Sequence, residues 1–183
     1  MISNESSLTQ KNAVLAVTGD VIDQVAALAP QQATYALRRE RAKVVASTQG
    51  SYDAMFAADV QGISVSERLL VALHASRLSG AASLASHYHQ RLLDMGIEPA
   101  QIRAIEKSDG GNVADSRLQT ILGFTATLIE RPVEGDRKAV EALENAGLTV
   151  PAIVALGQLI AFLSYQIRVT AGLQAMAAME AAS

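Results

Sequence analysis

The sequence has no cysteine and no tryptophan, and aromatic residues make up only 4% of its 183 residues. Without a thiol, the chain forms no disulfide, offers no thiolate to a metal and has no cysteine nucleophile or redox couple. Alanine, in contrast, supplies 33 of the 183 residues. A core rich in alanine and poor in aromatic side chains favours closely packed helices over a sheet.

The sequence also has no large excess of charge of one sign. It contains 15 Lys and Arg and 18 Asp and Glu, so its net charge is −3. One basic cluster, Arg38, Arg39, Arg41 and Lys43, is interrupted by Glu40. Such a mixture is typical of a solvated helix face or of a salt bridge between subunits. We therefore expect no nucleic-acid partner.

Targeting signals and very long apolar runs are missing as well. Residues 1–11 are polar and contain no apolar stretch after a basic start, which predicts no secretory signal and a cytoplasmic protein. The longest apolar run, Val150 to Tyr165, contains Gln158 and is shorter than the roughly 20 residues of a bilayer span. We expect no membrane contact and interpret this run as a core helix or an oligomer contact.

The length of the chain predicts one domain over residues 20–183, preceded by a partly disordered tail at residues 1–19. No segment alternates polar and apolar residues over enough positions for a strand, so the predicted fold class is all-α. Helices are expected over residues 20–29, 31–48, 65–78, 81–95, 99–106, 116–130, 137–145 and 151–171, with a loop at 108–112.

Local signals mark several helix ends. Ser64 and Glu67 have the spacing of a capping box, which predicts a helix that begins at Val65. A shift of 51 residues superposes Leu92, Gly96, Ile97, Ile102 and Ile105 on Leu143, Gly147, Leu148, Ile153 and Leu156. Each copy has the pattern of a helix closed by glycine and followed by a second amphipathic helix. The sequence therefore predicts two related helical hairpins.

These hairpins, with the segment from Glu67 to Gly96, resemble the carboxymuconolactone decarboxylase superfamily, and within it the alkylhydroperoxidase-D-like, peroxidase-related proteins. Further similar stretches lie at residues 20–30, 38–41, 49–56 and 146–169, so the resemblance covers about residues 20–175. It implies an alkylhydroperoxidase-D-like helical bundle that assembles as a trimer or hexamer. It also implies an association with antioxidant peroxide defence.

The resemblance further implies, for active peroxidases, a relay of the form Glu…Cys-x-x-Cys-x-x-x-His. Two registers are open, with relay His87 or His89, and they place the two cysteine positions at Gly80 and Ser83 or at Ala82 and Ala85. Neither register has a thiol, so the thiol peroxidase activity cannot be carried over. Glu67 lies 13 residues before Gly80, a spacing close to that of the family's relay glutamate, so the resemblance implies this role for it.

Glu67 and His87 are the first candidate pair. A carboxylate and an imidazole titrate on either side of neutrality and can move a proton without a cofactor. This suits decarboxylation or isomerisation of a lactone acid, which active relatives perform without cysteine. The alternative is that Glu67 serves only the capping box with Ser64.

Ser83 and His87 are four residues apart, so on a helix they share one face and could act as nucleophile and base. No oxyanion pocket or orienting acid is visible beside them, and Ser83 can equally be an ordinary surface residue. His87 and His89 lie roughly 200° apart around a helix axis and cannot bind one metal. We expect neither a metal nor a cofactor.

Two hypotheses of different class remain. In the first, the protein is a homo-oligomeric enzyme that uses Glu67 and His87, with Ser83 as a third candidate, on a small organic acid or lactone. In the second, it is a non-catalytic family member that binds a small molecule or a related family protein.

Overall fold

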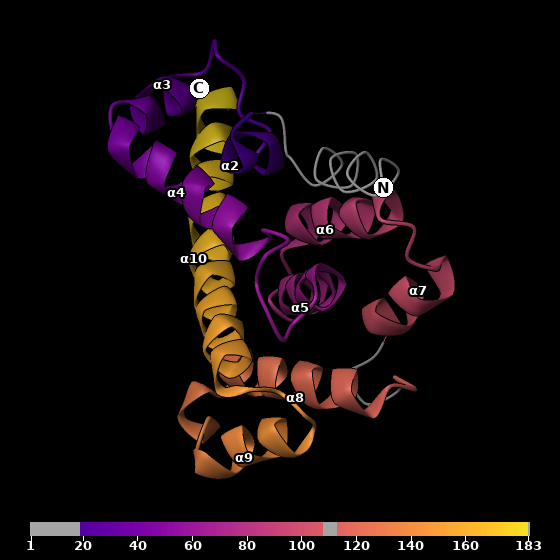
Figure 1. Ribbon diagram of the computed structural model, residues 1–183. Coiled ribbons are helices and arrows are strands. Elements are labelled where there is room, and N and C mark those ends of the chain that lie inside the picture. Colours follow the sequence, from indigo (N-terminus) through magenta and orange to yellow (C-terminus); the bar gives the residue numbers. More distant parts are fainter. Residues whose placement is uncertain (1–18, 108–112, 183) are drawn as a thin grey trace, which may run out of the picture.

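A computed structural model describes residues 19–107 and 113–182 and shows an all-α protein, without strands in those two ranges (Figure 1). Most of the expected tail and the loop at 108–112 lie outside the described residues. The helices are α2 (Val21–Val25), α3 (Ala33–Arg39), α4 (Ala42–Met55), α5 (Val65–Leu78), α6 (Ala82–Asp94), α7 (Pro99–Lys107), α8 (Ser116–Glu130), α9 (Arg137–Asn145) and α10 (Val150–Ala181), with a 3₁₀ turn at Pro132–Glu134.

Helix α5 lies at the centre of the fold. It begins at the predicted capping box, because the Ser64 hydroxyl accepts the N–H of Glu67 at 3.1 Å and the Glu67 carboxylate accepts the N–H of Ser64 at 2.7 Å. All residues from Arg68 to Ser76 are buried. A helix covered on all sides needs neighbours on all sides, and Figure 1 shows α6, α7, α8 and α10 around it.

The two glycine-closed turns have the same geometry. Gly96 and Gly147 both adopt positive φ, +76° and +84°. In each turn the next residue donates its N–H to the carbonyl four residues before the glycine, at 3.0 Å (Ile97 to Leu92, and Leu148 to Leu143). Each glycine also donates its own N–H to the carbonyl three residues earlier (Gly96 to Leu93, and Gly147 to Glu144). This pair of hydrogen bonds is the Schellman motif, and glycine adopts its positive φ at no steric cost. The structure confirms the local pattern that the sequence repeats after 51 residues.

The N-terminal helices differ from the prediction. The single helix expected over 31–48 is wrong, since α3 ends at Arg39 and α4 begins at Ala42. Before the break, Arg38 pairs with Asp23 at 2.7 Å and is drawn to α2. After it, Tyr52 turns inward with only 1% of its surface exposed. The break lets α3 and α4 pack against different neighbours. These tertiary contacts leave no sign in the periodicity of the sequence.

Helix α10 is longer than expected, ending at Ala181 rather than near residue 171. Thr149 caps its start as predicted. Near its end, the Glu180 carboxylate accepts the backbone N–H groups of Ala33 and Thr34 at 2.7 and 3.0 Å and so caps α3. This tertiary contact keeps the last turns in place.

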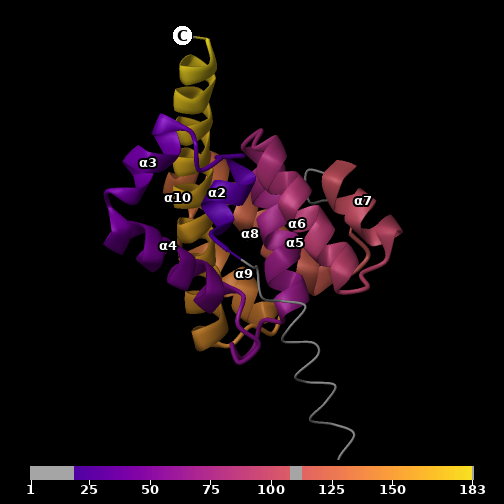
Figure 2. The ribbon, with the colours of Figure 1, turned by 90° about the horizontal axis from the view of Figure 1, so that it is seen from above.

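By length and composition, α10 is long and apolar enough to cross a membrane, because it has 32 residues and contains an 18-residue window with a mean hydropathy of 1.7. The apolar run Val150 to Tyr165 is only the first part of this helix, because the helix continues past Gln166 and Arg168. Figures 1 and 2 show α3 and α4 on one side of α10 and α5 to α7 on the other. Its buried side, including Leu159 and Leu163, belongs to the core that these helices share.

Candidate functional site

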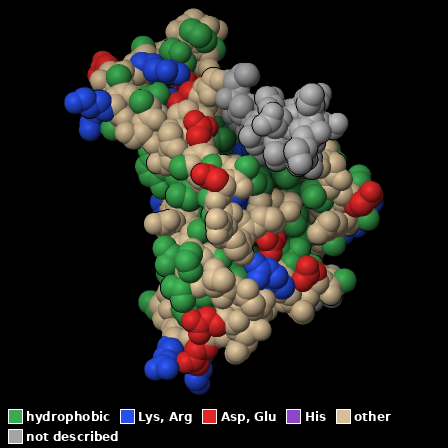
Figure 3. Space-filling model, viewed as in Figure 1, with side chains coloured by type: hydrophobic (Ala, Val, Ile, Leu, Met, Phe, Trp, Pro, Cys, Tyr) green, Lys and Arg blue, Asp and Glu red, His purple; other side chains and the backbone are tan. Residues whose placement is uncertain are grey.

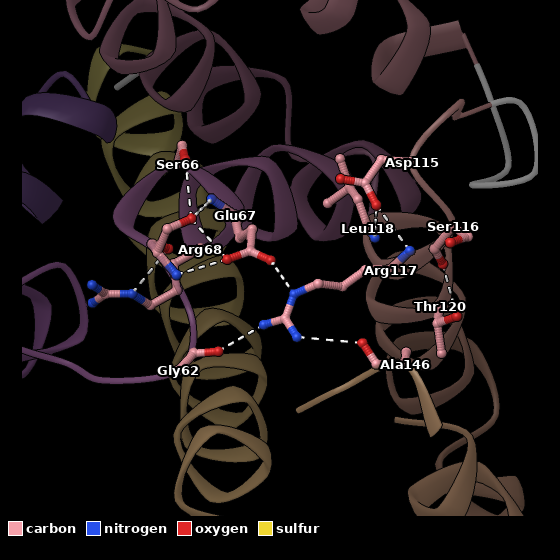
Figure 4. A network of polar contacts seen from close by, with 11 residues as sticks. Gly62, Ser66, Glu67, Arg68, Asp115, Ser116, Arg117, Leu118, Thr120 and Ala146 are labelled. Carbon is pink, nitrogen blue, oxygen red and sulfur yellow. Dashed lines mark hydrogen bonds and ion pairs between the residues drawn. The ribbon is translucent and has the colours of Figure 1, made fainter. Parts of the chain in front are cut away.

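Glu67 is held in a network at the start of α5 (Figure 4). Its Oε2 accepts the Ser64 backbone N–H and the Ser64 hydroxyl, both at 2.7 Å. Its Oε1 accepts Nε of Arg117, from α8, at 2.8 Å. Arg117 also donates to the carbonyls of Gly62 at 2.7 Å and Ala146 at 3.4 Å. The network thus links α5, α8 and the end of α9.

These contacts fix the charge of Glu67. Burial acts to raise its pKa, but the hydrogen bonds from Ser64 and Arg117 outweigh burial and hold the pKa below the ordinary value. Glu67 is therefore an ionised carboxylate at neutral pH, with both oxygens engaged. Its contacts are those of a helix cap and an interhelical ion pair.

His87 belongs to a different cluster, formed by α4 and α6. Its Nε2 lies 2.6 Å from the Tyr52 hydroxyl. Nη1 of Arg91, one helical turn after His87, donates to the same hydroxyl at 2.6 Å. Tyr52 and Arg91 are 1% and 6% exposed, so the Tyr52 hydroxyl is bonded on both sides inside the protein.

The direction of these hydrogen bonds follows from the donor inventory. An arginine side chain can only donate, so the Tyr52 oxygen accepts from Arg91. We assign the single proton of the Tyr52 hydroxyl to its hydrogen bond with Nε2 of His87, because this assignment gives that buried proton an acceptor. An imidazole that accepts at Nε2 is neutral and carries its proton on Nδ1.

Electrostatics agree with this assignment. Burial, and then the nearby Arg91 cation, lower the pKa of His87 to about 4. Burial raises the pKa of Tyr52 to about 12, although Arg91 acts in the opposite direction. At pH 7 the cluster therefore holds a neutral imidazole, a neutral phenol and one guanidinium cation.

Aromatic rings surround this cluster. The Arg91 guanidinium lies 5.3 Å from the ring centroid of Tyr52 and 5.0 Å from that of Phe56, within cation–π range. Tyr88 packs against His87 at 5.1 Å between ring centroids and donates its hydroxyl to Gln166 of α10. Burial raises the pKa of Tyr88 well above its ordinary value. The polar groups therefore lie in a setting of low polarity, where their mutual interactions are strong.

The other residues singled out in the sequence lie apart from this cluster. The Ser83 hydroxyl accepts a hydrogen bond from Nε2 of Gln174 at 3.0 Å. His87, in contrast, is bonded through its Nε2 to the Tyr52 hydroxyl. His89 pairs through Nδ1 with Glu106 of α7 at 2.7 Å. His74 is fully buried in α5. Within residues 19–107 and 113–182 no three His, Asp or Glu side chains gather as metal ligands do.

The structure thus does not bring Glu67 and His87 together through any contact between described side chains. Glu67 contacts Ser64 and Arg117, and His87 contacts Tyr52 and Tyr88. Sequence reasoning missed Tyr52, which is 35 residues from His87. One signal was available, since Arg91 follows His87 by four residues and shares its helix face.

The comparisons with known proteins give one informative result. No family model matches the chain, and no curated protein matches it significantly. A solved structure of a cysteine-to-alanine variant of the debrominase Bmp8, in complex with 2,3,4-tribromopyrrole, is similar with a TM-score of 0.67. The two share 15% sequence identity, and the similarity covers 93% of this chain and 86% of that one. The chain therefore shares its fold with the debrominase, while 15% identity carries no statement about activity.

Proposed function

We propose that this protein is a cysteine-free relative of the carboxymuconolactone decarboxylase and alkylhydroperoxidase-D-like proteins that transfers protons, without a cofactor, to and from a small organic acid or lactone. The proposal rests mainly on the chain of hydrogen bonds from Arg91 through Tyr52 to a neutral His87. It moves the acid–base role expected of Glu67 to Tyr52, because Glu67 is occupied at the start of α5.

The proposed step uses the proton positions derived above. His87 donates its Nδ1 proton to a carbanion or enolate carbon of the substrate. Nε2 takes the Tyr52 proton at the same time, so the imidazole stays neutral throughout. The negative charge passes to the Tyr52 oxygen, where the Arg91 guanidinium stabilises it. The reverse sequence removes a proton from a carbon acid.

The debrominase is similar to this chain in fold alone. The substitution printed for that protein removes a cysteine, and the ligand printed for it is a small brominated heterocycle. This chain has no cysteine at any position, so no thiol step enters the proposal. Binding of a small ligand is the feature that we carry over, and we place that ligand beside His87.

Exchange of carbon-bound hydrogen in D₂O tests the proposal. The protein is incubated with a panel of small lactones and carboxylic acids, and ¹H NMR follows loss of each α-proton signal. We expect acceleration for at least one compound, and a decrease of roughly 10²-fold or more in both Tyr52→Phe and His87→Gln. Ser86→Ala, an exposed residue on the same helix, is the control. Equal rates in His87→Gln and wild type would contradict the proposal.

A second candidate function is a non-catalytic member that binds a small ligand or a related family protein. The contacts of Glu67 with Arg117 and of Ser83 with Gln174 favour it, because both candidate residues are held by structural partners. In that case no compound in the panel exchanges faster than in buffer. Co-purification of this protein with thiol-containing family proteins from the same cell would then reveal a complex.

We also propose a homo-oligomer, as the resemblance implies. Val150 and Val154 at the start of α10 are 64% and 53% exposed. Figure 3 shows hydrophobic side chains gathered over the surface along α10. Light scattering after size exclusion should give a trimer or hexamer mass, reduced to smaller species in Val154→Glu. A monomer mass for the wild type would contradict this.

A further inference from the structure

The face that α3 and α4 form with α10 is hollowed, and neither His87 nor Glu67 lines the hollows described here. The first hollow, about 430 Å³, is lined by Lys43, Ser47, Ser51 and Phe162 among others. The second, about 240 Å³, is lined by Leu37, Val45, Val169 and Leu173 among others. Val44, Thr48 and Tyr165 line both, so the two hollows form one continuous trough.

The two ends of the trough differ in chemistry. Around the first hollow stand an ammonium group and hydroxyl groups, from Lys43, Ser47 and Ser51. Lys43 is exposed, and no residue in the described ranges forms an ion pair with it. The second hollow is lined by aliphatic side chains, among them Val169 and Leu173, and also by Arg38 and Arg41. Arg38 is paired with Asp20 and Asp23. The trough is thus amphipathic, with basic side chains at both hollows and most of its aliphatic lining in the second.

The middle of the trough is fixed in shape. The Thr48 and Tyr165 hydroxyls are 3.0 Å apart and hydrogen-bond each other. This bond holds the Tyr165 ring, 42% exposed, as a wall common to both hollows. Val44, 45% exposed, lines the trough from α4. The site is therefore built by three helices, α3, α4 and α10, and needs no rearrangement of the backbone to admit a ligand.

We propose that this trough binds a monocarboxylate with an unbranched apolar tail. The carboxylate pairs with Lys43 beside the serine hydroxyls, and the tail lies on Tyr165, Val169 and Leu173. The combined space is within the range of roughly 300–1,000 Å³ typical of small-molecule sites. Charge complementarity selects an anionic head, and the aliphatic lining selects the tail. The site lies beyond the proposed function, because it uses none of the residues of the Tyr52 cluster.

Isothermal titration calorimetry with octanoate, octanol and acetate tests the proposal. We expect octanoate to bind the wild type, octanol to bind more weakly and acetate not to bind. Lys43→Gln should weaken octanoate roughly three- to five-fold and leave octanol unchanged. Lys138→Gln, an exposed lysine on α9, is the matched control and should bind octanoate as the wild type does. Val44→Asp should abolish binding of both long-chain probes.

Three outcomes would overturn the inference. One is absence of octanoate binding to the wild type. Another is equal octanoate affinity in Lys43→Gln and Lys138→Gln. The third is a wild-type oligomer that Val44→Asp dissociates while octanoate has no effect, since the trough would then be covered by a second copy. Should Val44→Asp unfold, as circular dichroism would show, Val44→Ser replaces it. His87→Gln should keep full octanoate affinity, which separates this site from the proposed catalytic one.

Discussion

Two polar clusters of this protein contain Glu67 and His87, the first candidate pair in its sequence, and the two clusters are built in opposite ways. The Glu67–Arg117 cluster lies at helix ends, where both side chains keep between a fifth and a third of their surface exposed. The Tyr52–His87–Arg91 cluster lies inside, with Tyr52 and Arg91 almost fully buried. The first places an ionised carboxylate beside a cation. The second places a cation beside two neutral groups.

The difference shows which cluster is suited to proton transfer. Glu67 has a lowered pKa and two occupied oxygens, so taking up a proton there breaks existing bonds. His87 is neutral, and Tyr52 already shares its proton with it. Moving that proton creates a charge that Arg91 is placed to stabilise. Each of the following predictions tests this contrast.

Tyr52→Phe should have the largest effect on stability. It removes the hydroxyl that bonds both His87 and Arg91, and leaves a buried charged donor without this acceptor. We expect a loss of about 3 kcal/mol in the free energy of unfolding, measured by urea denaturation. Tyr165→Phe, which removes a hydroxyl near the surface, is the matched control and should cost less than about 1 kcal/mol. Equal losses would erase the contrast between buried and exposed hydroxyls.

The pH dependence of stability should come next in size. The pKa of His87 is about 4 in the folded protein, against an ordinary value of 6.5 for histidine. Between these values the unfolded chain binds the proton more readily, so stability falls as pH drops from 6.5 towards 4 and is unaffected above 6.5. We expect a loss of about 2 kcal/mol across this window.

His87→Gln should remove that loss, and urea titrations at intervals of pH would measure it. Glu67 acts in a different window, because its lowered pKa adds stability that disappears only as pH falls below the ordinary value of 4.5. An unchanged profile between pH 6.5 and 4 in His87→Gln would show that the histidine is not held in its neutral form.

Glu67→Gln should have a smaller effect. It removes the charge facing Arg117 but keeps an oxygen for the N–H of Ser64. We expect a loss of about 0.5–1 kcal/mol, decreasing as salt is added because exposed ion pairs are screened. Glu67→Ala also removes the cap and should lose about 1 kcal/mol more. Thermal denaturation at low and high salt measures both, and a loss independent of salt would contradict the ion-pair explanation.

Ser83→Ala should have the smallest effect. It removes one partly exposed hydrogen bond with Gln174, so we expect a change within about 0.5 kcal/mol. The exchange rate in D₂O should stay at the wild-type value. A decrease of tenfold or more would restore Ser83 to the proposed chemistry and weaken the separation between the two clusters.

Features set by neighbouring residues could be predicted from sequence. The capping box of Ser64 and Glu67 and the glycine closures at Gly96 and Gly147 depend on contacts within a few positions. The ends of α5 and α8 agree with the predicted ones because such caps define them. The all-α class followed from the same local periodicity.

Features set by distant contacts could not be read in the same way. The break between Arg39 and Ala42 serves two different neighbours, and the extra turns of α10 are held by its contact with α3. Tyr52 reaches His87 across two helices. In the sequence it is one of four tyrosines, with nothing near it to indicate a polar partner. Burial, which decides the pKa values, is a property of the assembled fold.

Because Glu180 caps α3, this cap can form only after α10 has been synthesised. Its partners Ala33 and Thr34 leave the ribosome 147 and 146 residues earlier than the glutamate that completes their helix. Because α10 also packs against α2 and α4, these earlier helices lack part of their packing until α10 has been synthesised. Until then, the nascent chain carries the apolar segments of α2 to α4 without the helix that covers them.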